Sequence, residues 1–359
     1  MTSSIFNFKR VPALLRRSRM PKGLLAALAG IALIELLVSL QPRPACKDLV
    51  RHRFYSPNVT PGTAESVVQW QVANITFLEE KQELLLLGGS ACLNNLDAEL
   101  LMEKTGLKTW NLGTFGFFYT DGHADILQFF IEHRGPPRFL VYHTSQEAVS
   151  ASRSKKEIRS WLRRLREWIV PPEPGNYPIP SLRYRRELRN RIFALGKNRV
   201  SYTGLDQPRE NFGSDREIRQ ILRERRGTGA GLRTHGSPER KGFPDRIFWD
   251  PRFDPACVEG LERIFAIARE HDFPVLVQFN PLPEQADNEM VRKAMEEMEE
   301  NLGRIAAPHP RVTLYRPFLR FYPDDHCADL RHLTEKGRRR QTGELIDWIR
   351  RHWLAPSKS

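Results

Sequence analysis

Short apolar runs alternate with longer amphipathic stretches from residue 83 to the C-terminus. The runs end in glycine or a polar residue, which is the pattern of strands buried on both faces of a parallel sheet. We predict five such strands, at residues 83–88, 107–112, 138–143, 274–279 and 311–315. Helices are predicted at residues 97–105, 121–132, 256–271, 284–302 and 334–352. This alternation predicts an α/β fold with a parallel five-stranded sheet covered on both faces by helices.

Residues 151–245 interrupt the alternation. They contain 23 of the chain's 56 Lys and Arg residues but only 11 of its 43 Asp and Glu residues. Residues 154–169 have the pattern of a basic amphipathic helix, and residues 227–244 are rich in glycine and arginine, as loops often are. We therefore predict a basic insertion between the third and fourth strands. Its charge favours a solvated surface, and anionic lipid headgroups or an anionic glycan are the alternative partners.

An apolar segment of 18 residues, Gly23–Leu40, contains a single charged residue, Glu35. As a helix it would be about 27 Å long, which is close to the thickness of a bilayer core. The six charged residues before it are all positive, and basic flanks of a membrane span stay in the cytoplasm. We predict a cytoplasmic tail at residues 1–22, a transmembrane helix at 23–40 and a connector at 41–82, with everything after the span outside the cytoplasm.

A cleaved signal peptide and a lipoprotein are the alternatives at the N-terminus. The residues after the apolar segment lack the pair of small residues, at −3 and −1, that precedes a signal-peptide cleavage site. Arg43-Pro44-Ala45 before Cys46 is a poor lipidation site. Both observations favour an uncleaved anchor. Glu35 would cost roughly 2.5–3.5 kcal/mol at the centre of a membrane. It therefore either reaches toward the outer surface or contacts another membrane protein.

Composition and charge narrow the possible functions. The chain has 359 residues, 40% of them hydrophobic, and a mean hydropathy of −0.50. These values exclude a wholly disordered chain and a multi-span membrane protein. The net charge of +13 is concentrated in the N-terminal tail and the insertion. Because the insertion is predicted outside the cytoplasm and no nucleic-acid-binding motif is present, we expect no nucleic-acid partner. Four cysteines are too few for a disulfide scaffold and are not spaced as metal ligands.

Candidate catalytic residues occur where predicted strands end. Ser90 directly follows the first strand, and Gly113 ends the second. Asp329 lies three residues before His332, just ahead of the last helix. Ligands gather at the carboxyl edge of an open parallel sheet. We therefore predict that Ser90 is a nucleophile, that His332 is its base and that Asp329 orients the imidazole.

The order of these motifs resembles that of the SGNH/GDSL hydrolase superfamily. Gly88-Gly89-Ser90 matches its first sequence block, Asn111-Leu112-Gly113 its second, and Asp329-Leu330-Arg331-His332 its last. The resemblance covers residues 83–353, interrupted by the insertion. It implies a three-layer flavodoxin-like sandwich with strand order 2-1-3-4-5.

A single N-terminal anchor makes the chain look most like the membrane-tethered branch of that superfamily. This branch includes the D-alanyl transfer protein of teichoic acid synthesis and the alginate and cellulose O-acetylation proteins. Such proteins work beside a multi-span membrane O-acyltransferase. The resemblance therefore implies a partner of that kind, with a glycan or another acyl acceptor.

Two positions depart from the superfamily pattern. Gly89 replaces an aspartate of the first block that is not the nucleophile. The third block normally supplies an asparagine to the oxyanion hole, where this chain has Ser145. We expect the N–H groups of Ser90 and Gly113 to form the oxyanion hole, with Ser145 as a weak substitute for the asparagine. The tethered branch often lacks this asparagine too.

These observations predict a membrane-anchored, extracytoplasmic serine acyltransferase or esterase. It would acylate or deacylate a cell-surface glycan through an acyl-serine intermediate, without a metal or an organic cofactor. A plain esterase would differ only in its final acceptor. A non-catalytic, membrane-tethered glycan-binding or assembly protein on the same scaffold is the alternative from another class.

Other reactive residues are expected to have structural roles. Cys92 is predicted to be a small buried residue in the first helical turn after Ser90. His143 is predicted to line a pocket at a strand end, and His123 to be an ordinary helix residue. Asp324, Asp325 and His326 are adjacent in a loop and lack the spacing of a metal site.

Overall fold

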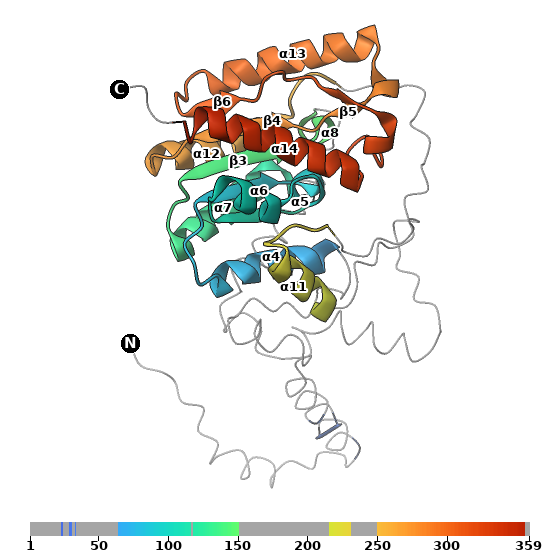
Figure 1. The fold of residues 1–359 in the computed structure, drawn as a ribbon. Helices are drawn as coiled ribbons and strands as arrows, with labels where there is room; N and C mark the ends of the chain where they lie inside the picture. The colour runs from blue at the N-terminus through green and yellow to red at the C-terminus, as the bar shows by residue number, and fades with distance from the viewer. Residues whose placement is uncertain are drawn as a thin grey trace. The chain divides into compact units, whose positions relative to one another are not determined.

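Five parallel strands form the central sheet, in the order β2-β1-β3-β4-β6; Figure 1 labels β3, β4 and β6 of this sheet. Every residue of the first four of these strands along the chain is buried. The strands are β1 (Leu84–Gly88), β2 (Thr109–Gly113), β3 (Phe139–Thr144), β4 (Val275–Phe279) and β6 (Val312–Leu314). The prediction of an α/β fold with a parallel five-stranded sheet is confirmed.

The computed structural model describes residues 64–115, 118–150, 215–230 and 250–355, together with the isolated positions 23, 29, 30 and 33. All described residues from 64 onward belong to one compact unit of the chain. The predicted tail, the rest of the predicted transmembrane helix, residues 41–63 of the connector and most of the insertion lie outside the described residues. Within the described residues, no helix has both the length and the apolar character needed to cross a membrane.

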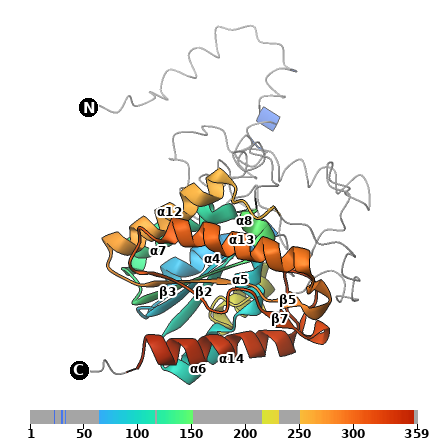
Figure 2. The same cartoon turned by 90° about the horizontal axis from the view of Figure 1, so that it is seen from above.

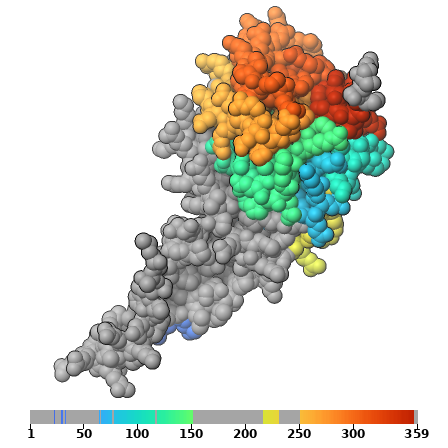
Figure 3. All heavy atoms as spheres, turned by 90° about the vertical axis from the view of Figure 1, so that its left-hand side faces the viewer, coloured from blue at the N-terminus to red at the C-terminus, as the bar shows by residue number. Residues whose placement is uncertain are grey.

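Helices cover both faces of the sheet (Figure 2). Helices α7, α12 and α13 pack on one face, and α6 and α14 pack on the other. Although the insertion separates α7 from α12 in sequence, the two helices lie side by side (Figure 3). The helices are α6 (Ala98–Thr105), α7 (Tyr119–Arg134), α12 (Pro255–Glu270), α13 (Glu289–Ala306) and α14 (Glu335–His352). The sheet therefore lies between two helical layers, each with its own apolar core.

Side-chain caps move helix boundaries away from those predicted. A helix was expected over residues 284–302, but α13 begins at Glu289 because the Asn288 side chain accepts a hydrogen bond from the Val291 N–H at 2.9 Å. Residues Glu284–Ala286 form a short 3₁₀ helix instead. A second, two-stranded parallel sheet, β5 (Leu282–Pro283) with β7 (Phe321–Tyr322), and a 3₁₀ turn at Asp324–His326 complete this region.

The predicted connector contains a helix of 14 residues, α4 (Ala64–Phe77). The sequence predicted only a connector over this range. All residues from Ser66 to Ile75 are buried, polar ones included. A helix that is buried on every side shows no alternation of apolar and polar residues with a period of 3.6, so its sequence lacked the expected signal.

The outer edge of β2 is covered by α4 and by the described part of the insertion. The Gln71 side chain donates hydrogen bonds to the carbonyl oxygens of Asn111 (3.1 Å), Gly113 (3.1 Å) and Gly227 (2.7 Å). The Asn111 N–H donates to the Arg226 carbonyl oxygen at 2.8 Å, and the Arg226 side chain donates to the Thr109 carbonyl oxygen at 2.7 Å. Backbone groups at the outer edge of β2 are thus hydrogen-bonded to the side chains of Gln71 and Arg226 and to the loop after α11.

The described part of the insertion, residues 215–230, contains helix α11 (Asp215–Glu224), which packs on α4. Residues 225–230 continue past β2 to α5 (Ser90–Asn95), where the Gly229 N–H donates to the Leu93 carbonyl oxygen at 2.8 Å. None of these described residues forms a strand of the sheet.

Gln71→Leu should lower the free energy of unfolding by roughly 1–3 kcal/mol, because buried carbonyl groups would lose their donor. Urea denaturation of the purified chain measures this change. Gln220→Leu is the matched control: Gln220 is exposed on α11, and its side chain donates along the helix to Glu224, so a change of about 0.5 kcal/mol or less is expected. Equal effects of the two substitutions would contradict the role of Gln71 at the strand edge.

Candidate active site

Ser90 is the first residue of α5, and Gly89 alone separates it from the end of β1. The chain turns sharply there, and Gly88 has a φ angle of +156°. A Cβ atom at Gly88 would lie 1.8 Å from the carbonyl oxygen of His143, on the neighbouring strand β3. Glycine is therefore required for β1 and β3 to remain paired up to the point where Ser90 enters the helix.

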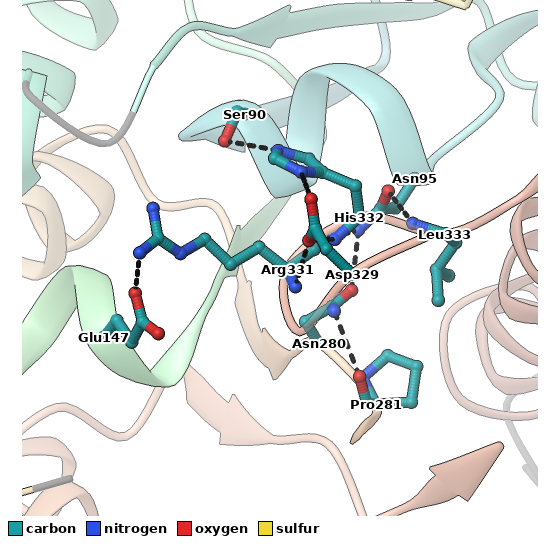
Figure 4. Close-up of polar contacts among 9 residues, drawn as sticks. All are labelled: Ser90, Asn95, Glu147, Asn280, Pro281, Asp329, Arg331, His332 and Leu333. Atoms are coloured by element: carbon teal, nitrogen blue, oxygen red, sulfur yellow. Dashed lines mark hydrogen bonds and ion pairs between the residues drawn. The ribbon is translucent and has the colours of Figure 1, made fainter. Parts of the chain in front are cut away.

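A tight turn before α14 carries Asp329 and His332. One oxygen of the Asp329 carboxylate accepts hydrogen bonds from the backbone N–H groups of Arg331 (2.6 Å) and His332 (2.8 Å). The carbonyl oxygen of His332 accepts a bond from the Ala328 N–H at 2.8 Å. These bonds define the turn, from which the His332 ring reaches toward α5 (Figure 4).

Two hydrogen bonds join Ser90, His332 and Asp329 in series (Figure 4). The Ser90 Oγ lies 2.9 Å from the His332 Nε2, and the His332 Nδ1 lies 2.8 Å from the Asp329 Oδ2. Both distances fall within the range of about 2.6–3.2 Å that proton transfer requires. A proton on Nδ1 can be donated to the carboxylate, which leaves Nε2 to accept the Ser90 hydroxyl proton. The structure thus brings together the three residues assigned to catalysis.

The pKa of Asp329 lies below its ordinary value. Partial burial alone would raise it, but hydrogen bonds from the His332 ring and from two backbone N–H groups stabilise the ionised form more strongly. Asp329 therefore carries a negative charge at neutral pH and can stabilise a positive charge on the His332 ring. The side chains of His332 and Asp329 are 30% and 49% exposed, so reagents in solution can reach the site.

The N–H group of Gly113, which was predicted to donate a hydrogen bond to an oxyanion, already has an acceptor within the protein. It donates to the Asn111 Oδ1 at 2.7 Å. A Cβ atom at Gly113 would lie 2.3 Å from the backbone nitrogen of Leu93, so the glycine allows α5 to pack directly onto β2. An oxyanion role for Gly113 requires that the bond to Asn111 be exchanged first.

Ser145, the third predicted oxyanion residue, is 8% exposed and precedes the short helix α8 (Gln146–Val149). Its carbonyl oxygen accepts a hydrogen bond from the Ala148 N–H at 3.1 Å. Within the described part of the chain, no hydrogen bond joins the Ser145 side chain to Ser90 or His332. Ser145 therefore does not belong to the hydrogen-bonded group formed by the other predicted residues.

An ion pair beside the site was not anticipated from the sequence. The Arg331 guanidinium pairs with the Glu147 carboxylate of α8 (Figure 4). This pair links the turn that carries His332 to the segment after β3. Two charged residues on separate elements have no spacing or periodicity that could mark them as partners in a sequence.

His123 and His143 are both buried in the core. His123 is 2% exposed and lies between the Thr114 hydroxyl (3.0 Å) and the Tyr142 hydroxyl (3.1 Å). His143 is fully buried, and its Nε2 lies 3.4 Å from the Gln341 Nε2. Burial lowers the pKa of each to about 3, so both rings are neutral at physiological pH. His123 lies in helix α7, as predicted, and belongs to the core.

Cys92 is fully buried in α5, and burial raises the pKa of its thiol. Its Sγ lies 3.4 Å from the Asn111 Oδ1, as suits an inert core thiol. In the ranges described, no group of three or more His, Cys, Asp or Glu side chains is arranged to hold a metal ion. The Asp325 Oδ1 and the His326 Nε2 are 4.0 Å apart.

Comparison with known proteins gives no family assignment. No protein-family model matches the chain, and no curated protein matches it. A solved structure described as a candidate platelet activating factor from Streptococcus pneumonia is similar over 80% of this chain and 92% of its own. The TM-score is 0.39 and the sequence identity is 10%. A likeness of this strength establishes no activity, so the function must be argued from the site itself.

Asp329→Asn should lower the free energy of unfolding near neutral pH, and the difference from wild type should shrink in acid. The pKa of Asp329 is lower in the folded chain than its ordinary value. Its carboxylate therefore stabilises the fold above about pH 4, and this stabilisation is lost as the pH falls through the folded-state pKa. Urea denaturation at several pH values measures the difference. Asp347→Asn, at an exposed position of α14, is the matched control, and it should change the free energy of unfolding at neutral pH by about 0.5 kcal/mol or less.

Proposed function

We propose that this protein is a membrane-anchored serine acyltransferase or esterase of the SGNH type, with Ser90, His332 and Asp329 as its catalytic residues. The observation that carries the proposal is the pair of hydrogen bonds from Ser90 through His332 to Asp329, at 2.9 and 2.8 Å. Ser90 lies 242 positions before His332 in the sequence, yet the two meet, and both imidazole nitrogens are engaged. A serine that merely occupied a turn would not need this arrangement.

The geometry supports covalent acyl transfer. The Ser90 Oγ attacks an ester carbonyl while the His332 Nε2 takes its proton, and the negatively charged Asp329 stabilises the imidazolium. Collapse of the tetrahedral intermediate breaks the ester bond, and His332 returns the proton to the leaving alcohol. A glycan hydroxyl or water then attacks the acyl-serine, gives its proton to His332 and takes the acyl group. His332 passes that proton to the Ser90 Oγ as the acyl bond breaks, which regenerates Ser90.

Donors for the developing oxyanion are fewer than the superfamily pattern supplies. The Ser90 N–H is at the first position of α5, where a helix offers no internal acceptor. The Gly113 N–H would contribute only after leaving Asn111. Loss of one such donor lowers a rate by roughly 10²–10³-fold. We therefore expect slow turnover of simple esters unless the acyl acceptor or a partner protein completes the site.

The proposed setting is the outer face of a cell membrane, with the tail in the cytoplasm and the catalytic unit outside. The apolar segment at 23–40 and the basic residues before it support this setting. The similarity of the motifs to the membrane-tethered SGNH branch further suggests a multi-span O-acyltransferase as the acyl donor and a cell-surface glycan as the acceptor.

A non-catalytic role is the second candidate, as a membrane-tethered glycan-binding or assembly protein. The engaged Gly113 N–H and the absence of the third-block asparagine favour it. The two candidates differ in the reactivity of Ser90, because only an activated serine reacts rapidly with a fluorophosphonate.

Wild-type protein should be labelled at Ser90 by a fluorophosphonate probe, as read by mass spectrometry. Ser90→Ala and His332→Ala should each remove nearly all labelling, because the two residues act as one unit. Asp329→Ala should slow labelling by roughly 10⁴-fold. Ser150→Ala is the control, since the Ser150 hydroxyl donates to the Asp250 carbonyl oxygen outside the site. Unlabelled, folded wild type would favour the non-catalytic candidate.

A reporter fused after Ser359 tests the proposed topology. With the N-terminus in the cytoplasm and a single span at 23–40, a reporter that works only outside the cytoplasm should be active. Replacing the six basic residues of the tail with neutral ones should reduce this activity, since they hold the tail inside. Activity of a reporter that works only in the cytoplasm would overturn the topology.

A further inference from the structure

The short helix α5 carries a polar residue at each end, Ser90 at the start and Asn95 at the finish. Asn95 is fully buried, so each of its polar side-chain atoms needs a partner within the protein. Figure 4 shows Asn95 beside the turn that holds His332. It is not one of the residues that the sequence motifs identify.

Asn95 holds the backbone on both sides of His332. Its Nδ2 donates to the carbonyl oxygen of Arg331 at 2.8 Å, and its Oδ1 accepts from the N–H of Leu333 at 2.9 Å. The first group belongs to the peptide unit that precedes His332, and the second belongs to the peptide unit that follows it. A single side chain thus fixes both peptide units from which the His332 ring projects.

The amide of Asn95 is itself held in place. Its Nδ2 also donates to the Asn280 Oδ1 at 2.7 Å, just after β4. The Asn280 N–H donates to the Thr144 carbonyl oxygen at 2.9 Å, which ties Asn280 to the end of β3. Both N–H groups and the oxygen of Asn95 therefore have partners, and only one orientation of the amide satisfies all three.

We propose that Asn95 is a positioning residue, which sets the His332 ring at hydrogen-bond distance from Ser90. Ser90 is part of α5, and His332 is attached to the same helix through Asn95, so α5 fixes the positions of both. The inference rests on the proposed function, because the position of the ring affects a rate only if His332 accepts the Ser90 proton. A misplacement of about 1 Å can lower such a rate about 10²-fold.

Asn95→Ala should slow fluorophosphonate labelling of Ser90 about 10²-fold per folded molecule. The matched control is Asn74→Ala: Asn74 is an asparagine on α4 that is 1% exposed, and among the described residues its side-chain amide has no hydrogen-bond partner. The control should be labelled at the wild-type rate. An unchanged labelling rate in folded Asn95→Ala, with wild type labelled, would overturn the proposal.

A second measurement separates positioning from general destabilisation and does not depend on Ser90 reactivity. ¹⁵N spectra of the histidine rings, assigned with His332→Ala, report which ring nitrogen carries the proton. Wild type and Asn74→Ala should show the His332 proton on Nδ1, held by Asp329. Asn95→Ala should show signals averaged between the two tautomers.

The two measurements fail in distinguishable ways. If wild type is not labelled, the proposed function fails, and the ¹⁵N spectra alone decide whether Asn95 positions the ring. A single, unchanged tautomer in Asn95→Ala would overturn the positioning role. Should Asn95→Ala not fold, N95D replaces it: the new carboxylate can accept from the Leu333 N–H but cannot donate to the Arg331 carbonyl. The same slowing and the same averaging are then expected, and wild-type values would overturn the proposal.

Discussion

The close packing of helix α5 against the ends of β1 and β2 determines where the candidate catalytic groups lie. Two glycines make this packing possible. A Cβ atom at Gly88 would strike the backbone of β3, and one at Gly113 would strike the backbone of α5 itself. Because the helix cannot shift without breaking these contacts, Ser90 at one end and Asn95 at the other hold fixed positions relative to the sheet. The site is thus built on a rigid element.

The sheet could be predicted because its strands are short apolar runs separated by helices, and a strand buried on both faces needs no other signal. Helix α4 could not be predicted in the same way. Its buried residues include Gln71, whose amide bonds to the edge of β2, and a polar residue of this kind resembles a surface position in a sequence. Buried polar residues that bond to distant backbone groups produce no periodic pattern of apolar and polar positions in the sequence.

The candidate site, like the fold, could be predicted from the sequence only in part. Ser90, Asp329 and His332 could be identified because they occur in short motifs at the ends of predicted elements. The sequence did not reveal that the Gly113 N–H is taken by Asn111 two residues earlier, since that bond depends on how the asparagine side chain folds back. The role of Asn95 could not be predicted for a related reason: its hydrogen-bond partners, Arg331 and Leu333, come near it only in the folded chain.

A strand of another chain cannot readily add to β2. Open strand edges present rows of backbone N–H and C=O groups on which a second chain can assemble, through augmentation or aggregation. Along β2, the Gln71 amide and the Arg226 guanidinium and carbonyl groups already bond to the outward-facing backbone of Thr109 and Asn111. An incoming strand would have to displace these contacts and part of the insertion with them. Any partner that approaches this side must therefore recognise the side chains of α4 and α11 rather than extend the sheet.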